Sequence, residues 1–402
     1  MTASLPVDAD FFRDPFPVFD RLRNRGPIHR LRRSDGVDRW IVVGTREIQD
    51  GLGDPRLSKD PDLIAEALCR QRLAHGADPV AARADVAQRA RFTRSFTSHV
   101  RAVVADTLRP ALAERRTELL TACADGVLDG LDDLDSAAGP VDLVRSYALP
   151  YAIRMTGILL CGTETAKFVE PAAEWLSPTT TGTRGMAAEQ LMAHLGDMAA
   201  RNEGRQDDVI SALAGRICTD GHGHGELALA CMVFTTISVE NTYSALATAV
   251  HTLLTHPDHL DLLAAHPKRI PHVVDELLRI GGPHNVSGQR CATEDLVLGG
   301  QLVEEGDLVV FALGAANHDP AVHSQPRRFD PNRPAGRHLA FGTGRHHCPA
   351  AHQARSAVAI ALTALLRRFP ELRLAVAPEE VPWQASETLR AVGSLPVRLR
   401  CR

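Results

Sequence analysis

The sequence predicts a mainly helical protein with small β-sheets at its edges, folded as a single domain over residues 1–402. Two observations support a helical core. From about Glu47 to Ile280, apolar residues recur at spacings of three and four, as on the buried face of an amphipathic helix. Within that region, the stretch from Glu226 to Leu254 has no proline or glycine and is apolar nearly all round. Such a stretch is typical of one long helix buried inside a large domain.

The β pieces are expected near the two ends of the chain. In "IHRLRRSDGVDRWIVVGT", Asp35-Gly36 predicts the turn of a hairpin whose second strand runs from Trp40 to Val43. After Arg290, "DLVLGGQLVEEGDLVVFAL" predicts two short strands joined through Gly299-Gly300. A helix returns at "AAHQARSAVAIALTALLRRF", and the tail "LRAVGSLPVRLR" indicates a strand, a turn and a strand. No internal repeat or low-complexity linker divides the chain.

Composition excludes several classes of protein. Lysine and arginine number 45 against 49 aspartates and glutamates, so the basic excess of a nucleic-acid-binding protein is missing. The eight cysteines form no C-x-x-C pair, which argues against a disulfide framework and favours a reducing compartment. We see no signal peptide at the start and no apolar stretch of about 18 residues that could span a membrane. We therefore expect a cytoplasmic protein, acting as a monomer without membrane or nucleic-acid partners.

Two polar residues stand at the centre of the long apolar helix. Glu240 and Asn241 share one face with Ile237, Ser244 and Thr248, by the three-and-four rule. A carboxylate and an amide inside an apolar helix are costly unless they are paired or hydrated. They are either a functional centre or a buried polar pair at a kink.

The stretch "HLAFGTGRHHCPA" places Cys348 among histidines and glycines. A zinc site needs four ligands, and Cys348 has no cysteine partner nearby. A nucleophilic cysteine stays open as an alternative. The interpretation of Cys348 as a haem-iron ligand explains more residues of the stretch, because Gly342 and Gly344 let the backbone approach a flat cofactor and aim N–H groups at a sulfur. Pro349 suits the first turn of a following helix, whose dipole favours the thiolate. A thiolate in such a setting can hold a haem iron.

These motifs resemble those of the cytochrome P450 family. "FGTGRHHC" is similar to the haem-binding signature of that family, and the likeness covers essentially the whole chain. In "AANHDP", His318 stands where the family usually has arginine. The resemblance implies a triangular helical prism, with haem between the long central helix and the cysteine-bearing helix. It also implies a structural triad from "DELLR" and "FDPNR", namely Glu276, Arg279 and Arg333.

The resemblance implies a haem b cofactor with Cys348 as its axial ligand. Its cofactor-binding residues would be Cys348, Phe341, His338, His346, Arg290, Arg89, Gly342 and Gly344. Two positions depart from the family pattern. Asp85 stands where a propionate-binding histidine is usual, so we expect it to turn away or to pair with Arg89. Ala350 replaces a glycine two residues after the cysteine, which should shift packing without abolishing haem binding.

The catalytic centre implied by the resemblance is "ISVENT". In the family an acid and then an alcohol, beside a glycine, relay protons to the oxygen that the iron activates. Glu240 keeps the acid, Asn241 replaces the alcohol, Ser238 replaces the glycine, and Thr242 is rotated by about 100° from Asn241. An amide donates hydrogen bonds but is a poor proton shuttle.

Three functions are compatible with this reading. The first is insertion of one oxygen atom from O2 into a small natural product of secondary metabolism, with NAD(P)H electrons arriving through a ferredoxin reductase and a ferredoxin. The second is oxidative C–C, C–O or C–N coupling or cyclisation without oxygen retention. The third is a non-catalytic haem-binding protein. Product mass separates the first two, and failure to turn over would favour the third.

The identity of the substrate cannot be predicted, but the residues that contact the substrate can be. We expect walls from the loop around Leu63 to Arg83, from "SPTTTGTRG", and from the following residues: Phe234, Ile237, Asn285, Val286 and Val392. Only 4% of the residues are aromatic, which favours a substrate with hydrogen-bonding groups over a fatty acid.

Overall fold

A computed structural model of the chain describes most of its residues. The described residues are 3–4, 8–32, 36–110, 113–135, 139–162, 166–176, 184–201, 208–219, 223–334 and 336–399. They form two compact units, each assembled from segments that are distant in the sequence. The first, here called the sheet unit, comprises Met1–Arg94, Leu278–Cys348 and Trp383–Arg390. The second, here called the helical unit, comprises Ser95–Leu277, Pro349–Pro382 and Ala391–Arg402.

The sheet unit is built on a six-stranded sheet with the strand order β1-β2-β3-β9-β6-β4. Its strands are β1 (Ala3–Ser4), β2 (Ile28–Arg32), β3 (Asp38–Val42), β4 (Leu57–Ser58), β6 (Arg290–Ala292) and β9 (Leu308–Phe311). The predicted N-terminal hairpin is confirmed, because β2 and β3 pair antiparallel with Ile28 opposite Val42. The predicted hairpin through Gly299-Gly300 is confirmed as well, as β7 (Leu296–Leu298) paired with β8 (Gln301–Val303).

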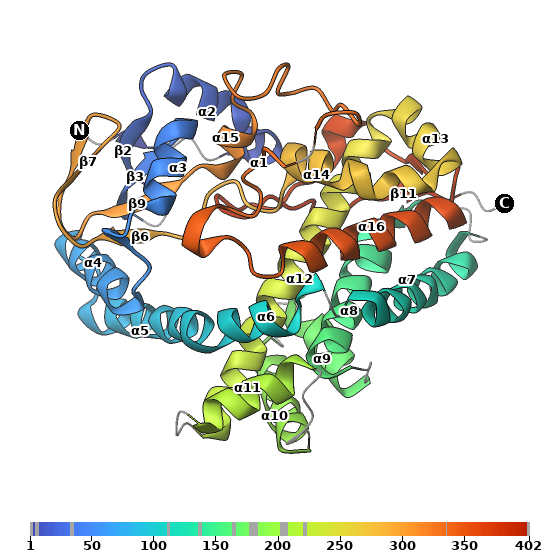
Figure 1. Cartoon of the computed structure of the whole chain (residues 1–402), viewed down its shortest axis with the longest axis horizontal. Helices are drawn as coiled ribbons and strands as arrows, with labels where there is room; N and C mark the ends of the chain where they lie inside the picture. The colour runs from blue at the N-terminus through green and yellow to red at the C-terminus, as the bar shows by residue number, and fades with distance from the viewer. Residues whose placement is uncertain are drawn as a thin grey trace. The chain divides into compact units, whose positions relative to one another are not determined.

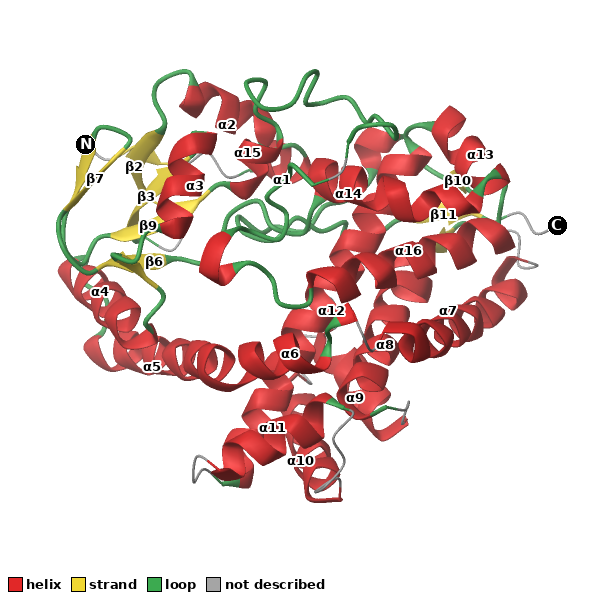
Figure 2. Ribbon diagram, viewed as in Figure 1, coloured by secondary structure: helices red, strands yellow, loops and turns green. Residues whose placement is uncertain are grey.

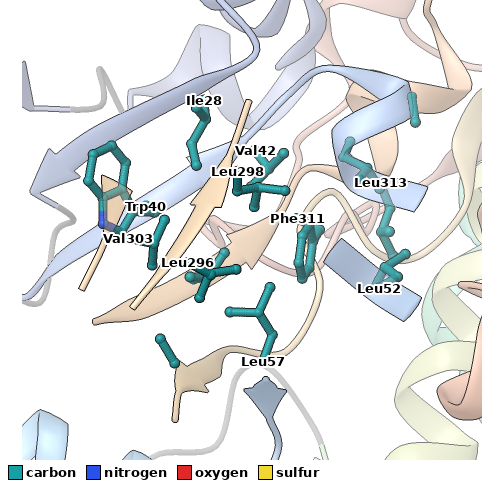
Figure 3. Close-up of a cluster of buried hydrophobic side chains, with 14 of the residues drawn as sticks. Ile28, Trp40, Val42, Leu52, Leu57, Leu296, Leu298, Val303, Phe311 and Leu313 are labelled. Carbon is teal, nitrogen blue, oxygen red and sulfur yellow. The ribbon is translucent and has the colours of Figure 1, made fainter. Parts of the chain in front are cut away.

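A cluster of buried apolar side chains holds this sheet together (Figure 3). All four residues of β9 are buried, which explains why its sequence is continuously apolar instead of alternating. Helix α3 (Thr45–Gly53) packs closely on the end of β9. A Cβ at Gly51 would lie 2.5 Å from the Phe311 ring, so only glycine permits this approach.

Short and medium helices complete the sheet unit. They are α1 (Ala9–Arg13), α2 (Phe16–Arg23), α4 (Pro61–Ala74), α5 (Pro79–Ser95, with Ser95 already in the helical unit) and α15 (Leu313–Asn317). The expectation of a loop around Leu63 to Arg83 was wrong, because α4 and α5 cover most of that stretch. Asp60 supplies the reason for α4, since its carboxylate accepts hydrogen bonds from the N–H groups of Asp62 and Leu63.

Helices make up most of the described chain, as the red ribbons of Figure 2 show, and most of them belong to the helical unit. Its helices are η1 (Phe96–Val100), α6 (Arg101–Thr107), α7 (Ala113–Asp135), η3 (Val144–Ala148), α8 (Leu149–Cys161), α9 (Ala166–Leu176), α10 (Arg184–Arg201), α11 (Val209–Thr219), α12 (His224–Leu254), α13 (Pro257–Ala265), η4 (Pro267–Arg269), α16 (Ala351–Arg368) and η6 (Pro378–Glu380). Helix α14 (Ile270–Gly281) runs from this unit into the sheet unit. A three-stranded sheet, β10 (Arg373–Leu374), β11 (Pro396–Arg398) and β5 (Val141–Asp142), completes the helical unit.

The predicted long central helix is confirmed as α12, the yellow helix of Figure 1. It packs against α8, α10, α11 and α16. Neighbours on so many sides explain why its sequence is apolar nearly all round. Its centre therefore lies inside the helical unit.

Two sequence-based expectations about the C-terminal part need correction. The tail was expected to form two strands, but only β11 is a strand, and Leu389 makes an isolated bridge with His284. Helix α16 begins at Ala351 with Ala350 as its N-cap, so Pro349 precedes the first turn instead of occupying it. Among the helices that the structure describes, none is both long enough and apolar enough to cross a membrane.

Candidate active site

The residues predicted to form the site fall in both units. The sheet unit holds Cys348, Phe341, His338, His346, Gly342, Gly344, Arg290 and Arg89. The helical unit holds the residues of the central helix, namely Ser238, Glu240, Asn241 and Thr242. Each group is described within its own unit.

The loop before Cys348 folds back on itself through two backbone hydrogen bonds. The Cys348 N–H donates to the Phe341 carbonyl at 2.9 Å, and the Gly342 N–H donates to the Leu339 carbonyl at 2.9 Å. Gly342 and Gly344 have φ values of +68° and +67°, in the left-handed region that side chains disfavour. Backbone conformation therefore accounts for both glycines. The Gly342 N–H is used within the loop.

Aromatic rings flank the start of this loop. The Phe341 ring lies 5.9 Å from the His338 ring and 6.3 Å from the His347 ring, measured between centroids. Nδ1 of His338 accepts a hydrogen bond from the Ala340 N–H at 3.2 Å. A neutral imidazole that accepts at Nδ1 carries its hydrogen on Nε2. His338 can therefore donate a hydrogen bond from Nε2 to an anionic group. His346 ends the 3₁₀ turn η5 (Gly344–His346).

Arg290 is a buried cation without an anionic partner among the described residues. Its side chain is fully buried at 0% exposure, and one guanidinium nitrogen, Nη1, donates to the Leu57 carbonyl at 3.3 Å. Within the described residues, its Nε and Nη2 have no hydrogen-bond partner. Burial, and then the positive charge of Arg345, lowers the pKa of Arg290 to about 10. Two unpaired donors on a buried cation fit a carboxylate such as a haem propionate.

The expected pairing of Asp85 is confirmed. The Asp85 carboxylate accepts from Nε of Arg89 at 2.9 Å and from Nη1 of Arg72 at 2.5 Å. The hydrogen bond from Arg72 is the main reason why the pKa of Asp85 is lowered from its ordinary value. Arg72 was not singled out from the sequence, because nothing in α4 marks it as a partner for a residue of α5. Part of the hydrogen-bonding capacity of Arg89 is used in this pair.

Two arginines of the expected structural triad hold the same loop segment. Arg279 donates to the carbonyls of Asn317 at 2.7 Å and Pro326 at 2.8 Å, and Arg333 donates to the Ser324 carbonyl at 2.9 Å. Glu276 and Arg279 are 4% and 2% exposed, so they are no ordinary surface pair. Their burial fits a structural role, since buried charges are retained where they bind several groups.

In the helical unit, the hydroxyl that replaces the usual glycine of the central helix has a defined partner. Ser238 Oγ lies 2.9 Å from Thr156 Oγ1 on α8. Thr156 has one hydroxyl hydrogen and gives it to the Ala152 carbonyl at 2.7 Å, because a carbonyl can only accept. Ser238 must therefore donate to Thr156. Its hydrogen is used in this bond, so Ser238 can hold a water only by accepting from it.

The other residues of "ISVENT" have distinct surroundings. Glu240 and Asn241 are partly buried, and Thr242 is 8% exposed. The Asn241 side chain makes no hydrogen bond to another described residue, so both its donors and its acceptor are available to a ligand or water. Thr242 lies on another part of the helix surface, as the rotation of about 100° per residue requires.

The predicted substrate contacts differ in how they are placed. Phe234 is 5% exposed and Ile237 is partly buried on α12. Asn285 is 2% exposed, and its Nδ2 donors have no partner within the described residues. Val286 packs in an apolar cluster with the N-terminal helices, and Val392 is fully buried. Residues 177–183 of "SPTTTGTRG" lie outside the described part of the chain.

Comparison with known proteins places these features in a family. The profile of the family described as Cytochrome P450 matches residues 268–399, which include the cysteine loop and Arg290. The chain is 32% identical to cytochrome P450 monooxygenase PikC of Streptomyces venezuelae, over 99% of this chain and 96% of that protein. It is 34% identical to nocardicin C N-oxygenase of Nocardia uniformis subsp. tsuyamanensis, over 98% of both chains.

Solved structures share the fold. The chain matches CxnD, a cytochrome P450 enzyme for C–S bond formation in chuangxinmycin biosynthesis, with a TM-score of 0.78 and 26% identity. The match covers all of this chain and 98% of that one. Proteins of one fold can thus be named for oxygen insertion or for bond formation, so the fold alone does not choose between the two reactions.

Proposed function

Because the chain belongs to the cytochrome P450 family and is an oxidoreductase of that family, we propose that it inserts one oxygen atom from O2 into a small natural product, by hydroxylation or epoxidation. The strongest support for the bound haem that this function requires is Arg290, a buried cation in the sheet unit with two donors that lack a partner among the described residues. Haem, the cofactor of the family, carries propionate groups that can serve as the anionic partner of Arg290. The cysteine loop in the same unit offers the thiolate that the haem iron requires.

Several residues of the sheet unit would hold the haem. Cys348 would bind the iron, and Arg290 and His338 would donate to the propionates. Arg89 would contribute less than in other family members, since Asp85 uses its Nε. When bound, haem supplies the reductive activation of O2, in which one oxygen atom enters the substrate and the other leaves as water.

The central helix would manage protons and orient the substrate. Glu240 is the acid that passes protons towards the reaction centre, and general acid catalysis of this kind contributes about 10²–10⁴-fold in rate. Asn241 would hold water or a polar substrate group through its amide, without passing a proton itself. Ser238 would fix α12 against α8 through Thr156, since its hydrogen is already donated there.

Electrons would come from NAD(P)H through a ferredoxin reductase and a ferredoxin. A ferredoxin is acidic, so its docking surface should be basic. Four exposed arginines are proposed for that surface, namely Arg91, Arg94, Arg337 and Arg345. Arg94 also pairs with Asp62.

Oxidative coupling or cyclisation is the second candidate. It is favoured by Asn241, which replaces the alcohol that supports oxygen insertion in the family, and by the similarity to CxnD. Substrates can be found by screening small natural products for a shift of the haem absorption band. Turnover with isotopically labelled O2 then separates the functions. A product that gains a labelled oxygen atom supports insertion, and a product that only loses two hydrogens supports coupling. A haem-binding protein without catalysis would give neither product with any reductase.

A further inference from the structure

The C-terminal half of α12 carries a continuous polar stripe. On an ideal helix, the positions between residues 240 and 255 that fall within a sector of about 120° are all polar. They are Glu240, Asn241, Ser244, Thr248, His251, Thr252 and Thr255. Earlier positions in the same sector include Val233, Phe234 and Ile237, which are apolar. The stripe therefore begins at the predicted catalytic acid and runs only towards the end of the helix.

Two hydroxyls in this stripe differ from three threonine hydroxyls of the same helix. Thr235, Thr236 and Thr252 each donate to the carbonyl four residues earlier, at 2.8, 2.8 and 2.9 Å. That back-bond is the ordinary solution for a hydroxyl in a helix. Ser244 and Thr248 are 0% and 1% exposed, and their hydroxyl oxygens have no hydrogen-bond partner among the described residues.

A buried hydroxyl without a partner is rare in native proteins and often marks an ordered water molecule. The two hydroxyls are four residues apart, so they lie on adjacent turns of one helix face. Ser244 is also four residues from Glu240 and three from Asn241, which makes it the neighbour of both. Water bound at Ser244 would therefore be adjacent to the acid and the amide.

We propose that Ser244 and Thr248 bind a file of internal water molecules that supplies protons to Glu240 from the C-terminal end of α12. The distance from Glu240 to Thr248 along the axis is about 12 Å, which two hydroxyls and a few waters can bridge. Each water or hydroxyl receives one proton and passes one on. The file is unchanged after each transfer, and one proton from solvent reaches the carboxylate.

The outer end of the stripe reaches solvent. Thr252 is 5% exposed, whereas Thr255 and His256 are only partly buried. The Thr255 hydroxyl donates to the Thr252 carbonyl at 2.9 Å, and Nδ1 of His256 donates to the same carbonyl at 2.8 Å. Thr252 gives its own hydrogen to the Thr248 carbonyl, so its oxygen can only accept from a water. These bonds fix the direction in which waters at this end can donate.

The water-binding part of this proposal is independent of the reaction, whereas the proton supply rests on the proposed function. A high-resolution crystal structure of the haem-loaded enzyme tests the first part directly. We expect ordered waters within hydrogen-bond distance of Ser244 Oγ and Thr248 Oγ1. Continuous protein packing with no water at either hydroxyl would overturn the proposal.

Three variants of the haem-loaded enzyme test the second part through NAD(P)H consumption and product yield in H2O and D2O. Thr248→Val keeps the side-chain shape and removes the hydroxyl, so the yield of product per NAD(P)H should fall by about tenfold. Thr248→Ser keeps the hydroxyl and should stay near wild type. Thr235→Val is the matched control, because Thr235 is equally buried and bonds only within its own helix.

The outcomes separate the two proposals. Loss of yield in Thr248→Val alone, with an altered solvent isotope effect, supports proton supply along the stripe. Equal yields in Thr248→Val and wild type would overturn it. If the product gains no oxygen atom but Thr248→Val still loses yield, oxygen insertion is refuted and the proton route stands.

Discussion

Replacing Arg290 with methionine should weaken haem binding without weakening the fold to the same extent. Arg290 is a buried cation whose Nε and Nη2 have no partner among the described residues. Methionine keeps an unbranched side chain of similar length and removes the charge. The variant therefore deletes the proposed propionate partner, and it also removes a charge that is costly to bury when no anion is present.

The size of the effect follows from the lowered pKa. Burial lowers the pKa of Arg290 from its ordinary value to about 10, and each pKa unit corresponds to about 1.36 kcal/mol, so the unpaired charge costs roughly 3 kcal/mol. A propionate that pairs with the buried charge recovers an energy of this order. Losing it corresponds to a haem dissociation constant that rises by about a hundredfold.

Haem transfer to an excess of apomyoglobin measures this prediction. The transfer rate should rise strongly in Arg290→Met. Arg390→Met is the matched control, because burial also lowers the pKa of Arg390 to about 10. The guanidinium of Arg390 lies 4.1 Å from the Trp383 ring centroid and donates to the Arg13 carbonyl. Arg390→Met should therefore lower the unfolding temperature, whereas its haem transfer rate should rise less than that of Arg290→Met. A transfer rate for Arg290→Met that matches wild type would refute the assignment of Arg290 to the haem.

Three further results are expected. Cys348→Ala should abolish the strongly red-shifted absorption band of the reduced protein with carbon monoxide, and its persistence would remove Cys348 as the iron ligand. Glu240→Gln should cripple turnover, while Asn241→Thr should change the product formed per NAD(P)H consumed without loss of haem. A Glu240→Gln enzyme with wild-type rate and yield would mean that protons arrive by another route. Reduction by ferredoxin should slow as salt is added, because salt screens exposed charges, and it should also slow in the charge-reversal variants Arg337→Glu and Arg345→Glu. A reduction rate independent of salt would contradict docking through these arginines.

Local sequence patterns were sufficient for the central helix, the two hairpins and the cysteine loop. The length of α12 was predictable because a run without proline or glycine, apolar nearly all round, has few alternatives to a buried helix. The hairpins followed from turn residues between apolar runs. The loop that ends at Cys348 followed from its resemblance to the haem-binding signature of the family, and the structure adds that both of its glycines have left-handed φ values. These features depend on residues that are neighbours along the chain.

Hydrogen-bond partners from distant segments were decided only by the tertiary structure. Ser238 meets Thr156, 82 residues away, and this contact fixes the direction in which the Ser238 hydroxyl donates. Asp85 was expected to turn away or to pair with Arg89, four residues along its own helix. It does pair with Arg89, but its second partner, Arg72, comes from another helix.

The burial of unpaired donors was likewise invisible in the sequence. An arginine after a helix is most often a solvated side chain, and serines or threonines in a helix most often bond to their own backbone. Only the fold encloses Arg290, Ser244 and Thr248 while leaving their polar atoms without partners among the described residues. Spacing along the chain specifies which residues share a helix face, but packing from several segments determines whether water can reach them.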